Sequence, residues 1–330
     1  MRKIANANAS DLKQAVALSA TVRRSERTPA FAGGGSDLLA LVKDGIVTPD
    51  VLINLKTVKS LDQIVSAADG SFAIGGLTTL DALGRHPGLR REHAVLAEAA
   101  ESVATPQIRN VGTLAGNLCQ RPWCWYFRNG FPCLKNGGNT CFSATGENQF
   151  HAIFGGGPSY IVHPSDTAPA LVALDATLRV VGPSGERSVP AAEFFVLPRE
   201  DARRENVLAP DEVLASVRLP ASPQGRQSAY HKILDREAWT HAVVSVAVVL
   251  DVNAGVCRDA RIVLGGVAPI PWRLPAVERL LVGQRITPEL AARAGELSVE
   301  GARPLAKNAY KVPLTRTIVR RTIADMAARA

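Results

Sequence analysis

The stretch FAGGGSDLL, from Phe31 to Leu39, places three consecutive glycines between a short apolar run and the start of a helical pattern. Glycines let the backbone turn tightly and approach a ligand with no side chain in the way. Ser36 and Asp37 stand where the helix would begin, so free amide N–H groups would face the loop and suit a pyrophosphate. The stretch matches neither the G-x-G-x-x-G fingerprint nor a P-loop. A plain turn between a strand and a helix explains it about equally well.

A second loop of small residues, TPQIRNVGTLAGN, runs from Thr105 to Asn117. Gly112, Thr113 and Gly116 again leave backbone amides accessible, and Asn117 adds a side chain that can hydrogen bond. Alone, this loop would fit a tight connection between two buried elements. Two such loops in one chain favour a dinucleotide, because a diphosphate needs hydrogen-bond donors from more than one direction.

Four of the five cysteines fall in the segment CQRPWCWYFRNGFPCLKNGGNTC, with the spacing C-x4-C-x8-C-x7-C. Four thiolates can complete a zinc site or ligate the irons of a cluster. Zinc knuckles usually show C-x2-C pairs, which this segment lacks, and the aromatic residues between its cysteines suit a larger cofactor shielded from water. The pattern favours an iron–sulfur cluster over zinc, and zinc over disulfides or inert thiols.

Two polar positions later in the chain are further candidates. Asp166 ends the motif HPSD, where its carboxylate could bond a ribityl or ribose hydroxyl, although ordinary helix capping explains it better. Lys232 lies in the predicted strand AYHKILDR, from Ala229 to Arg236. A lysine there could favour the negative charge of a reduced flavin, but such a side chain is more often simply exposed.

The length of 330 residues and the 46% hydrophobic content predict a large core and two or three domains. The pattern predicts a helix capped by Ser10 and a strand at 159–163, followed by a connection between domains at 199–226. An antiparallel sheet is expected over 229–267, and helices near 273–283, 287–297 and 314–328.

The net charge of +8 is spread over scattered basic residues, which indicates a solvated surface rather than a nucleic-acid groove. No apolar run reaches the roughly 18 residues of a membrane helix. The N-terminus lacks the apolar region of a signal peptide, so the sequence predicts a cytoplasmic chain without membrane insertion. It contains neither a Gly-x-Ser-x-Gly elbow nor an H-E-x-x-H helix.

Taken together, these stretches resemble the FAD-binding medium subunits of the xanthine dehydrogenase and carbon monoxide dehydrogenase family, over essentially the whole chain. AGGGSDLL is similar to the family's first FAD loop and VGTLAGN to its second, while GGVAPIPWR and NAYKVPLTRTIVRRTI resemble its C-terminal signatures. The resemblance implies these FAD-binding residues: Phe31, Ala32, Gly33, Gly34, Gly35, Ser36, Asp37, Leu38, Gly112, Thr113, Leu114, Gly116, Asn117, Asp166 and Lys232.

The cysteine insertion is similar to that of the flavin subunits of periplasmic aldehyde oxidoreductases and 4-hydroxybenzoyl-CoA reductases, which carry an extra 4Fe–4S cluster. The resemblance implies that Cys119, Cys124, Cys133 and Cys141 ligate such a cluster. It also implies transport to the periplasm if a partner with a twin-arginine signal carries the complex.

The resemblance implies an α+β fold, with a two-part FAD-binding region of the vanillyl-alcohol-oxidase (PCMH) type followed by a C-terminal antiparallel sheet with helices. The expected divisions are 1–60, 61–225 with the cluster insertion at 119–141, and 226–330.

The implied partners are a small subunit with 2Fe–2S clusters, a large subunit with the molybdenum cofactor, and an external electron acceptor. The expected function is electron transfer in a heterotrimeric molybdenum hydroxylase, with an aldehyde as the expected substrate. A zinc- or cluster-holding regulatory module without flavin, and a self-sufficient flavin oxidase, are the alternatives.

Overall fold

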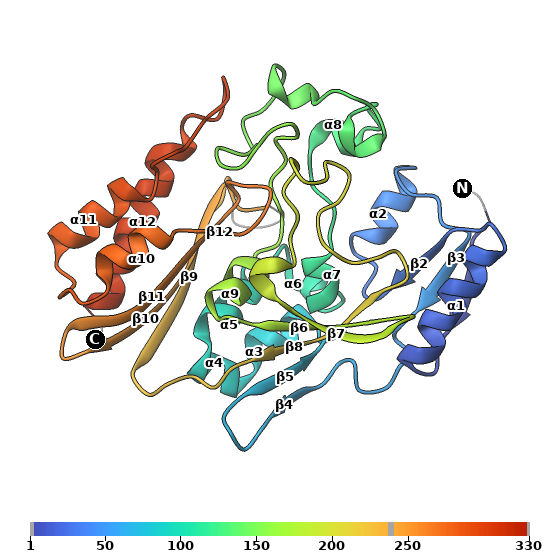
Figure 1. Cartoon of the computed structure of the whole chain (residues 1–330), viewed down its shortest axis with the longest axis horizontal. Coiled ribbons are helices and arrows are strands. Elements are labelled where there is room, and N and C mark those ends of the chain that lie inside the picture. The colour runs from blue at the N-terminus through green and yellow to red at the C-terminus, as the bar shows by residue number, and fades with distance from the viewer. Residues whose placement is uncertain (1–2, 237–240, 329–330) are drawn as a thin grey trace.

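The computed structural model describes residues 3–236 and 241–328, which form three β-sheets with helices packed against them. The sheets follow one another along the chain, from the N-terminal sheet at one end of the molecule to the C-terminal sheet at the other (Figure 1). No helix in these ranges is long and apolar enough to span a bilayer. The mixed fold confirms the α+β prediction.

The N-terminal sheet is parallel, with the order β1-β3-β2. Its core is closed by helix α1, whose buried residues Ala15, Val16 and Ser19 follow helical spacing. The elements of this part are β1 (Ala5–Asn8), α1 (Leu12–Arg24), β2 (Pro29–Ala32), α2 (Leu38–Lys43) and β3 (Val51–Asn54).

Asp11, and not the predicted Ser10, caps helix α1. Asp11 has the extended backbone of an N-cap residue, and its carboxylate accepts from the Gln14 amide at 2.7 Å. The Ser10 amide instead donates to the Gln14 side chain at 2.6 Å. The predicted cap was therefore wrong by one residue.

The second sheet is antiparallel, with the order β4-β5-β8-β6-β7. Apolar residues of this sheet share one large core with the helices that follow β5, and with α9. The strands are β4 (Ile64–Ser66), β5 (Phe72–Gly75), β6 (Thr177–Gly182), β7 (Gly185–Pro190) and β8 (Val213–Leu219). The helices are α3 (Leu80–Arg85), α4 (Pro87–Glu92), α5 (Ala94–Glu101), α6 (Pro106–Arg109), α7 (Leu114–Leu118) and α9 (Thr167–Ala173), with the 3-10 turn η3 (Ala191–Glu193).

Strand β8 lies in the middle of this sheet, although the sequence predicted a connection over 199–226. It pairs with β5 on one side and β6 on the other, and most of its side chains are buried. Charged and proline-rich segments on both sides hide this short strand in the sequence, and only its pairing with distant strands defines it.

The predicted strand at 159–163 is absent from the structure, which has irregular backbone there. The Tyr160 carbonyl accepts from the Ala152 amide, and the His163 amide donates to the Ala268 carbonyl. These hydrogen bonds go to two different segments, so no strand ladder forms.

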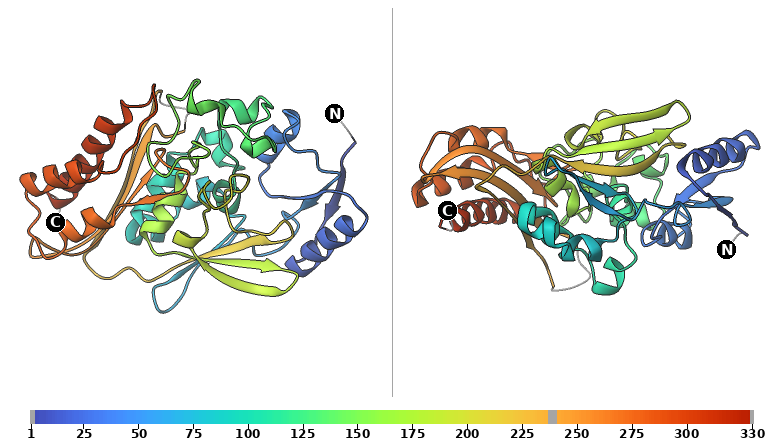
Figure 2. Two further views of the ribbon diagram at one scale, coloured as in Figure 1. Left: turned by 45° about the horizontal axis from the view of Figure 1, so that its top comes forward. Right: turned by 90° about the horizontal axis from the view of Figure 1, so that it is seen from below.

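The C-terminal sheet is antiparallel, with the order β12-β11-β10-β9, as predicted for 229–267. Its helices pack on one face and share a core with it (Figure 2). The predicted helices all form, and the last begins three residues before the expected position. The elements are β9 (Arg226–Ile233), β10 (Val244–Asn253), β11 (Val256–Gly265), β12 (Trp272–Arg273), α10 (Pro275–Leu281), α11 (Pro288–Leu297) and α12 (Lys311–Ala327).

The cysteine segment joins α7 to the irregular stretch that leads to α9 and lies beside α2 at the top of Figure 1. Its only helical elements are the short turns α8 (Trp125–Arg128) and η1 (Leu134–Asn136), and the turn η2 (Phe142–Ala144) follows directly after it. A small apolar cluster of Leu41, Phe127 and Cys133 attaches it to α2.

Candidate functional site

The two glycine loops meet at a distance that only glycine allows. A Cβ atom built on Gly34 would lie 1.8 Å from the Val111 carbonyl oxygen and 3.2 Å from the Gly112 Cα. A Cβ atom on Gly112 would lie 3.7 Å from the Ser36 hydroxyl. The structure therefore brings together the two stretches from which the sequence predicted a nucleotide site.

The loops differ in their free hydrogen-bond donors. Within the described chain, the amides of Gly34, Gly35 and Ser36 make no hydrogen bond. In the second loop, the Leu114 and Ala115 amides donate to the backbone carbonyls of Thr78 and Gly76, both at 2.9 Å, and the Gly116 amide donates to the Thr113 hydroxyl. The first loop thus offers amides to a ligand, while the second is held in place by bonds to protein atoms.

Asn117 connects the second loop to the start of α9. Its side-chain oxygen accepts from the Ser165 and Thr167 hydroxyls, both at 2.6 Å. The sequence singled out Asn117 but missed these two hydroxyls, since they lie about 50 residues further along the chain. Their place beside Asp166 in HPSDT was the only available signal.

Asp166 and Lys232 form a buried ion pair at 2.7 Å, with side-chain exposures of 4% and 3%. Asp166 also accepts from the Tyr230 hydroxyl at 2.7 Å, and Lys232 also donates to the Ser102 carbonyl at 2.9 Å. Asp166 makes no capping bond to α9, and Lys232 is not exposed, so neither of the simpler explanations applies.

Tyr230 is a member of this group that the sequence reasoning missed. It lies two residues before Lys232 on β9, so strand alternation puts both side chains on the same face. Burial raises the pKa of Tyr230 well above its usual range, and the Asp166 carboxylate adds to the shift. The hydroxyl therefore stays protonated and donates to Asp166.

The structure brings three of the four clustered cysteines together. Cys124, Cys133 and Cys141 line one small pocket, whereas Cys119 packs against the core of the second sheet. Burial raises the pKa of the Cys119 thiol to about 12 and also raises that of Cys124. All five cysteines are free thiols, and within 3–236 and 241–328 no three potential ligands stand in a metal-binding arrangement.

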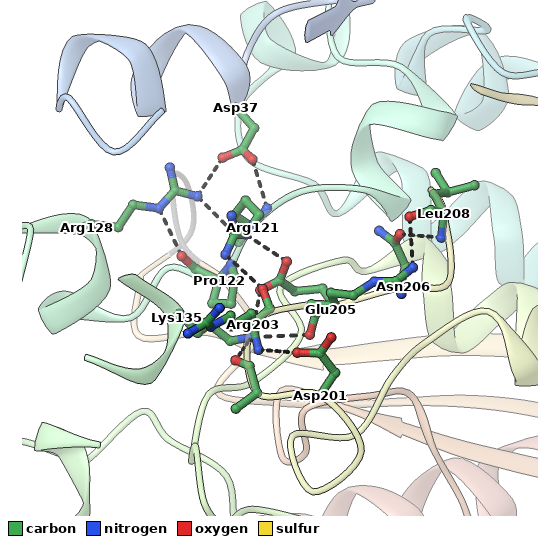
Figure 3. Close-up of polar contacts among 12 residues, drawn as sticks. Asp37, Arg121, Pro122, Arg128, Lys135, Asp201, Arg203, Glu205, Asn206 and Leu208 are labelled. Carbon is green, nitrogen blue, oxygen red and sulfur yellow. Dashed lines mark hydrogen bonds and ion pairs between the residues drawn. The ribbon is translucent and has the colours of Figure 1, made fainter. Parts of the chain in front are cut away.

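Charged side chains attach the cysteine segment to its surroundings (Figure 3). The Asp37 carboxylate accepts from the Arg128 guanidinium at 2.6 Å and from the Arg121 amide at 2.9 Å. Glu205 is buried between Arg121 and Lys135, each at 2.7 Å. Asp37, predicted for cofactor binding, therefore directs its carboxylate toward the cysteine segment.

Side chains of the C-terminal region hydrogen bond to the backbone that follows the cysteine segment. The Lys311 ammonium donates to the carbonyls of Phe150 at 2.9 Å and Gly266 at 2.7 Å, and the Asn308 amide donates to the His151 carbonyl. The His151 Nε2 lies 3.4 Å from the Cys124 sulfur. Burial lowers the pKa of Lys311 to about 7 and that of His151 to about 4.

A hollow of about 400 Å³ lies elsewhere, between the N-terminal helix and the second sheet. Its lining includes Asp11, Lys59 and Arg179 but none of the predicted cofactor residues. We therefore do not assign the nucleotide to it.

Comparisons with known proteins agree on the family. Residues 2–222 match the model of the FAD binding domain in molybdopterin dehydrogenase, and residues 229–326 match that of the CO dehydrogenase flavoprotein C-terminal domain.

The aldehyde oxidoreductase FAD-binding subunit PaoB of Escherichia coli (strain K12) is 35% identical over 92% of this chain and 94% of its own length. The carbon monoxide dehydrogenase medium chain of Hydrogenophaga pseudoflava is 28% identical over 88% of this chain and 86% of its own. The nicotinate dehydrogenase FAD-subunit of Eubacterium barkeri is 28% identical over 79% of this chain and 74% of its own length.

Solved structures share the fold along the whole chain. Quinoline 2-oxidoreductase from Pseudomonas putida 86 has a chain that superposes with a TM-score of 0.78 at 24% identity, covering 100% of this chain and 98% of that one. A chain of carbon monoxide dehydrogenase from Hydrogenophaga pseudoflava superposes with a TM-score of 0.77 at 24% identity, covering 99% of this chain and 98% of that one. The two glycine loops, the buried pair beside them and these matches lead to one conclusion: the chain belongs to the family of FAD-binding subunits of molybdenum hydroxylase-type dehydrogenases.

Proposed function

We propose that this chain passes electrons from the 2Fe–2S clusters of a small partner subunit to an external acceptor, in a complex that oxidises aldehydes at molybdenum on a large subunit. The observation that carries the proposal is the contact between the two glycine loops, with free amides on the first loop. The chain's membership of an oxidoreductase subunit family supports it.

The residues of the first loop fit a diphosphate. The amides of Gly34, Gly35 and Ser36 have no protein acceptor in the described chain, and no side chain on Gly34 blocks their approach. The second loop would act mainly as the rigid wall behind them, because most of its amides are already bonded. We infer that the contributions of 31–38 and 112–117 are unequal, with most phosphate hydrogen bonds coming from the first loop.

The Asp166–Lys232 pair would orient the rest of the nucleotide. Asp166 would offer carboxylate oxygens to the polyol hydroxyls, and Lys232 would bring positive charge near the ring. When bound, FAD would supply the redox chemistry, accepting electrons singly and releasing them to the acceptor. The protein holds the charges in position because Tyr230 and the Ser102 carbonyl fix the pair from both sides.

We also propose a 4Fe–4S cluster at the cysteine segment, where it would supply a one-electron relay. The shared pocket of Cys124, Cys133 and Cys141 supports this, as do the aromatic side chains of Tyr126 and Phe142 that line it. The arrangement departs from the four-cysteine expectation at Cys119, which lies outside the pocket.

The substrate and the partners are inferred from relatives. The name of the Escherichia coli relative describes an aldehyde oxidoreductase subunit, and this chain would serve a similar complex. An exposed Trp125, 66% accessible on the cysteine segment, supports a protein interface there. If the large or small subunit carries a twin-arginine signal, the complex would work in the periplasm; otherwise it would remain in the cytoplasm.

The test is to purify the chain with its partner subunits without exposure to air and to measure FAD, iron, sulfide and zinc. We expect one FAD per chain, and iron in excess of the small subunit's 2Fe–2S clusters that is lost in Cys133→Ala but kept in Cys257→Ala, because Cys257 is buried in the C-terminal core. Zinc without flavin would instead indicate a regulatory module. Aldehyde oxidation by this chain alone would indicate a self-sufficient oxidase and would contradict the proposal.

A further inference from the structure

The pocket of the cysteine segment holds three thiols and not four. Cys124, Cys133 and Cys141 line it. Cys119, at the C-terminal end of α7, lies outside this lining and packs instead against the core of the second sheet. A cubane cluster bound in this pocket would therefore lack one cysteine ligand.

Ser159 also lines this pocket. The residue is only 3% exposed, and its hydroxyl makes no hydrogen bond to any residue that the structure describes. Because hydroxyls of buried residues usually have a partner, this unpaired oxygen in the same lining as three cysteines is available to a ligand.

The other polar groups near the pocket are less suited to complete a ligand set with the three cysteines. The Ser143 hydroxyl contacts the Cys141 sulfur at 3.1 Å. The His151 Nε2 lies 3.4 Å from the Cys124 sulfur, where it would donate to that thiolate. Lys135 lines the pocket, but its ammonium is paired with Glu205 and has no lone pair for iron. Ser159 alone among these groups combines burial, a free oxygen and a place in the lining.

We propose that the cluster is held by Cys124, Cys133, Cys141 and the Ser159 oxygen, and that Cys119 is not a ligand. The inference rests on the 4Fe–4S cluster of the proposed function. Binding through the serine oxygen forms one Fe–O bond and releases the hydroxyl proton to solvent, without a change in oxidation state. An alkoxide is a harder donor than a thiolate, so it should stabilise ferric iron and lower the reduction potential of the cluster.

The experiment compares Cys119→Ala, Ser159→Ala and Ser159→Cys in the complete complex. Iron and sulfide are measured per FAD, EPR spectra are recorded, and the cluster potential is determined by redox titration. Cys119→Ala should keep the wild-type iron content, about four irons per FAD above those of the small subunit's 2Fe–2S clusters, and an unchanged spectrum. Ser159→Ala should lose iron or convert to a three-iron form. Ser159→Cys should keep its iron, with a changed EPR signal and a higher potential.

Three results would overturn the ligand assignment: loss of iron in Cys119→Ala at normal FAD content, an unchanged cluster in Ser159→Ala, or a Ser159→Cys cluster identical to the wild type. The FAD content of each variant reports folding, and Ser159→Cys decides the matter if Ser159→Ala does not fold. Wild-type complex with FAD but with no iron beyond that of the small subunit's 2Fe–2S clusters would refute the 4Fe–4S cluster itself. Such additional iron in the wild type, with any of the three results, would leave the cluster standing and refute only the role of Ser159.

Discussion

Replacing Gly34 with alanine should disrupt FAD binding through one added methyl group. The new Cβ would stand 1.8 Å from the Val111 carbonyl oxygen, whereas real Cβ atoms essentially never approach another heavy atom within 3.0 Å. The two loops would have to part by roughly 1.2 Å, the difference between these distances. Overpacking of this kind costs about 1–3 kcal/mol. If the cost falls on the binding-competent form, FAD affinity should drop by about 5- to 150-fold.

The matched control is Gly33→Ala, the same change one residue earlier. Its Cβ would meet a Leu77 methyl at 3.0 Å and the Thr113 hydroxyl at 3.3 Å, and both are side-chain atoms that can shift. FAD per chain and the FAD dissociation constant, from flavin fluorescence, should rank wild type, Gly33→Ala and Gly34→Ala in order of decreasing affinity. Equal affinity in Gly34→Ala and wild type would refute the idea that the close loop contact shapes the nucleotide site.

Three further changes test the buried charges. Glu205→Gln should lower the unfolding free energy by about 3–5 kcal/mol, because it leaves the buried Lys135 ammonium without a compensating negative charge. Urea titration measures this loss, and a loss below about 1 kcal/mol would contradict the prediction. Asp166→Asn should cost a similar amount, and adding Lys232→Met should recover part of it, which a double-mutant cycle measures. Burial lowers the pKa of Lys311 from its ordinary 10.5 to about 7 in the folded chain. Between pH 7 and 10.5 the unfolded chain therefore binds this proton more tightly than the folded chain, so the free energy of unfolding rises with pH in that range. Lys311→Met should remove up to about 1.4 kcal/mol of that rise per pH unit, and an unchanged slope from pH 7 to 10 would show that the lysine does not titrate in this range.

Patterns that depend on near neighbours could be read from the sequence. The C-terminal sheet follows from alternating apolar runs separated by short turns, and α1 from its apolar spacing. The family follows from the resemblance of the glycine loops and the C-terminal stretches to known FAD-binding subunits, which the family models confirm. The run at 159–163 shows the limit of such reading: it is apolar enough for a strand, but no neighbouring strand pairs with it.

Contacts between distant residues could not be read in this way. Asp37 and Arg128 are 91 positions apart, and Asp166 and Lys232 are 66 apart. The spacing of the four cysteines predicted one ligand set, but the direction in which α7 leaves the second loop turns Cys119 toward a different core.

The sequence by itself therefore determined the family and the fold class, through its resemblance to known FAD-binding subunits. It also located the two glycine loops, because their residue types reflect local backbone freedom. Only the tertiary structure decided which side chains share a pocket: it paired Lys232 with Asp166, buried Glu205 between two cations, and put Ser159 in one pocket lining with Cys124, Cys133 and Cys141. The physical reason is that an ion pair or ligand set depends on how separate elements pack, and no local pattern records that packing.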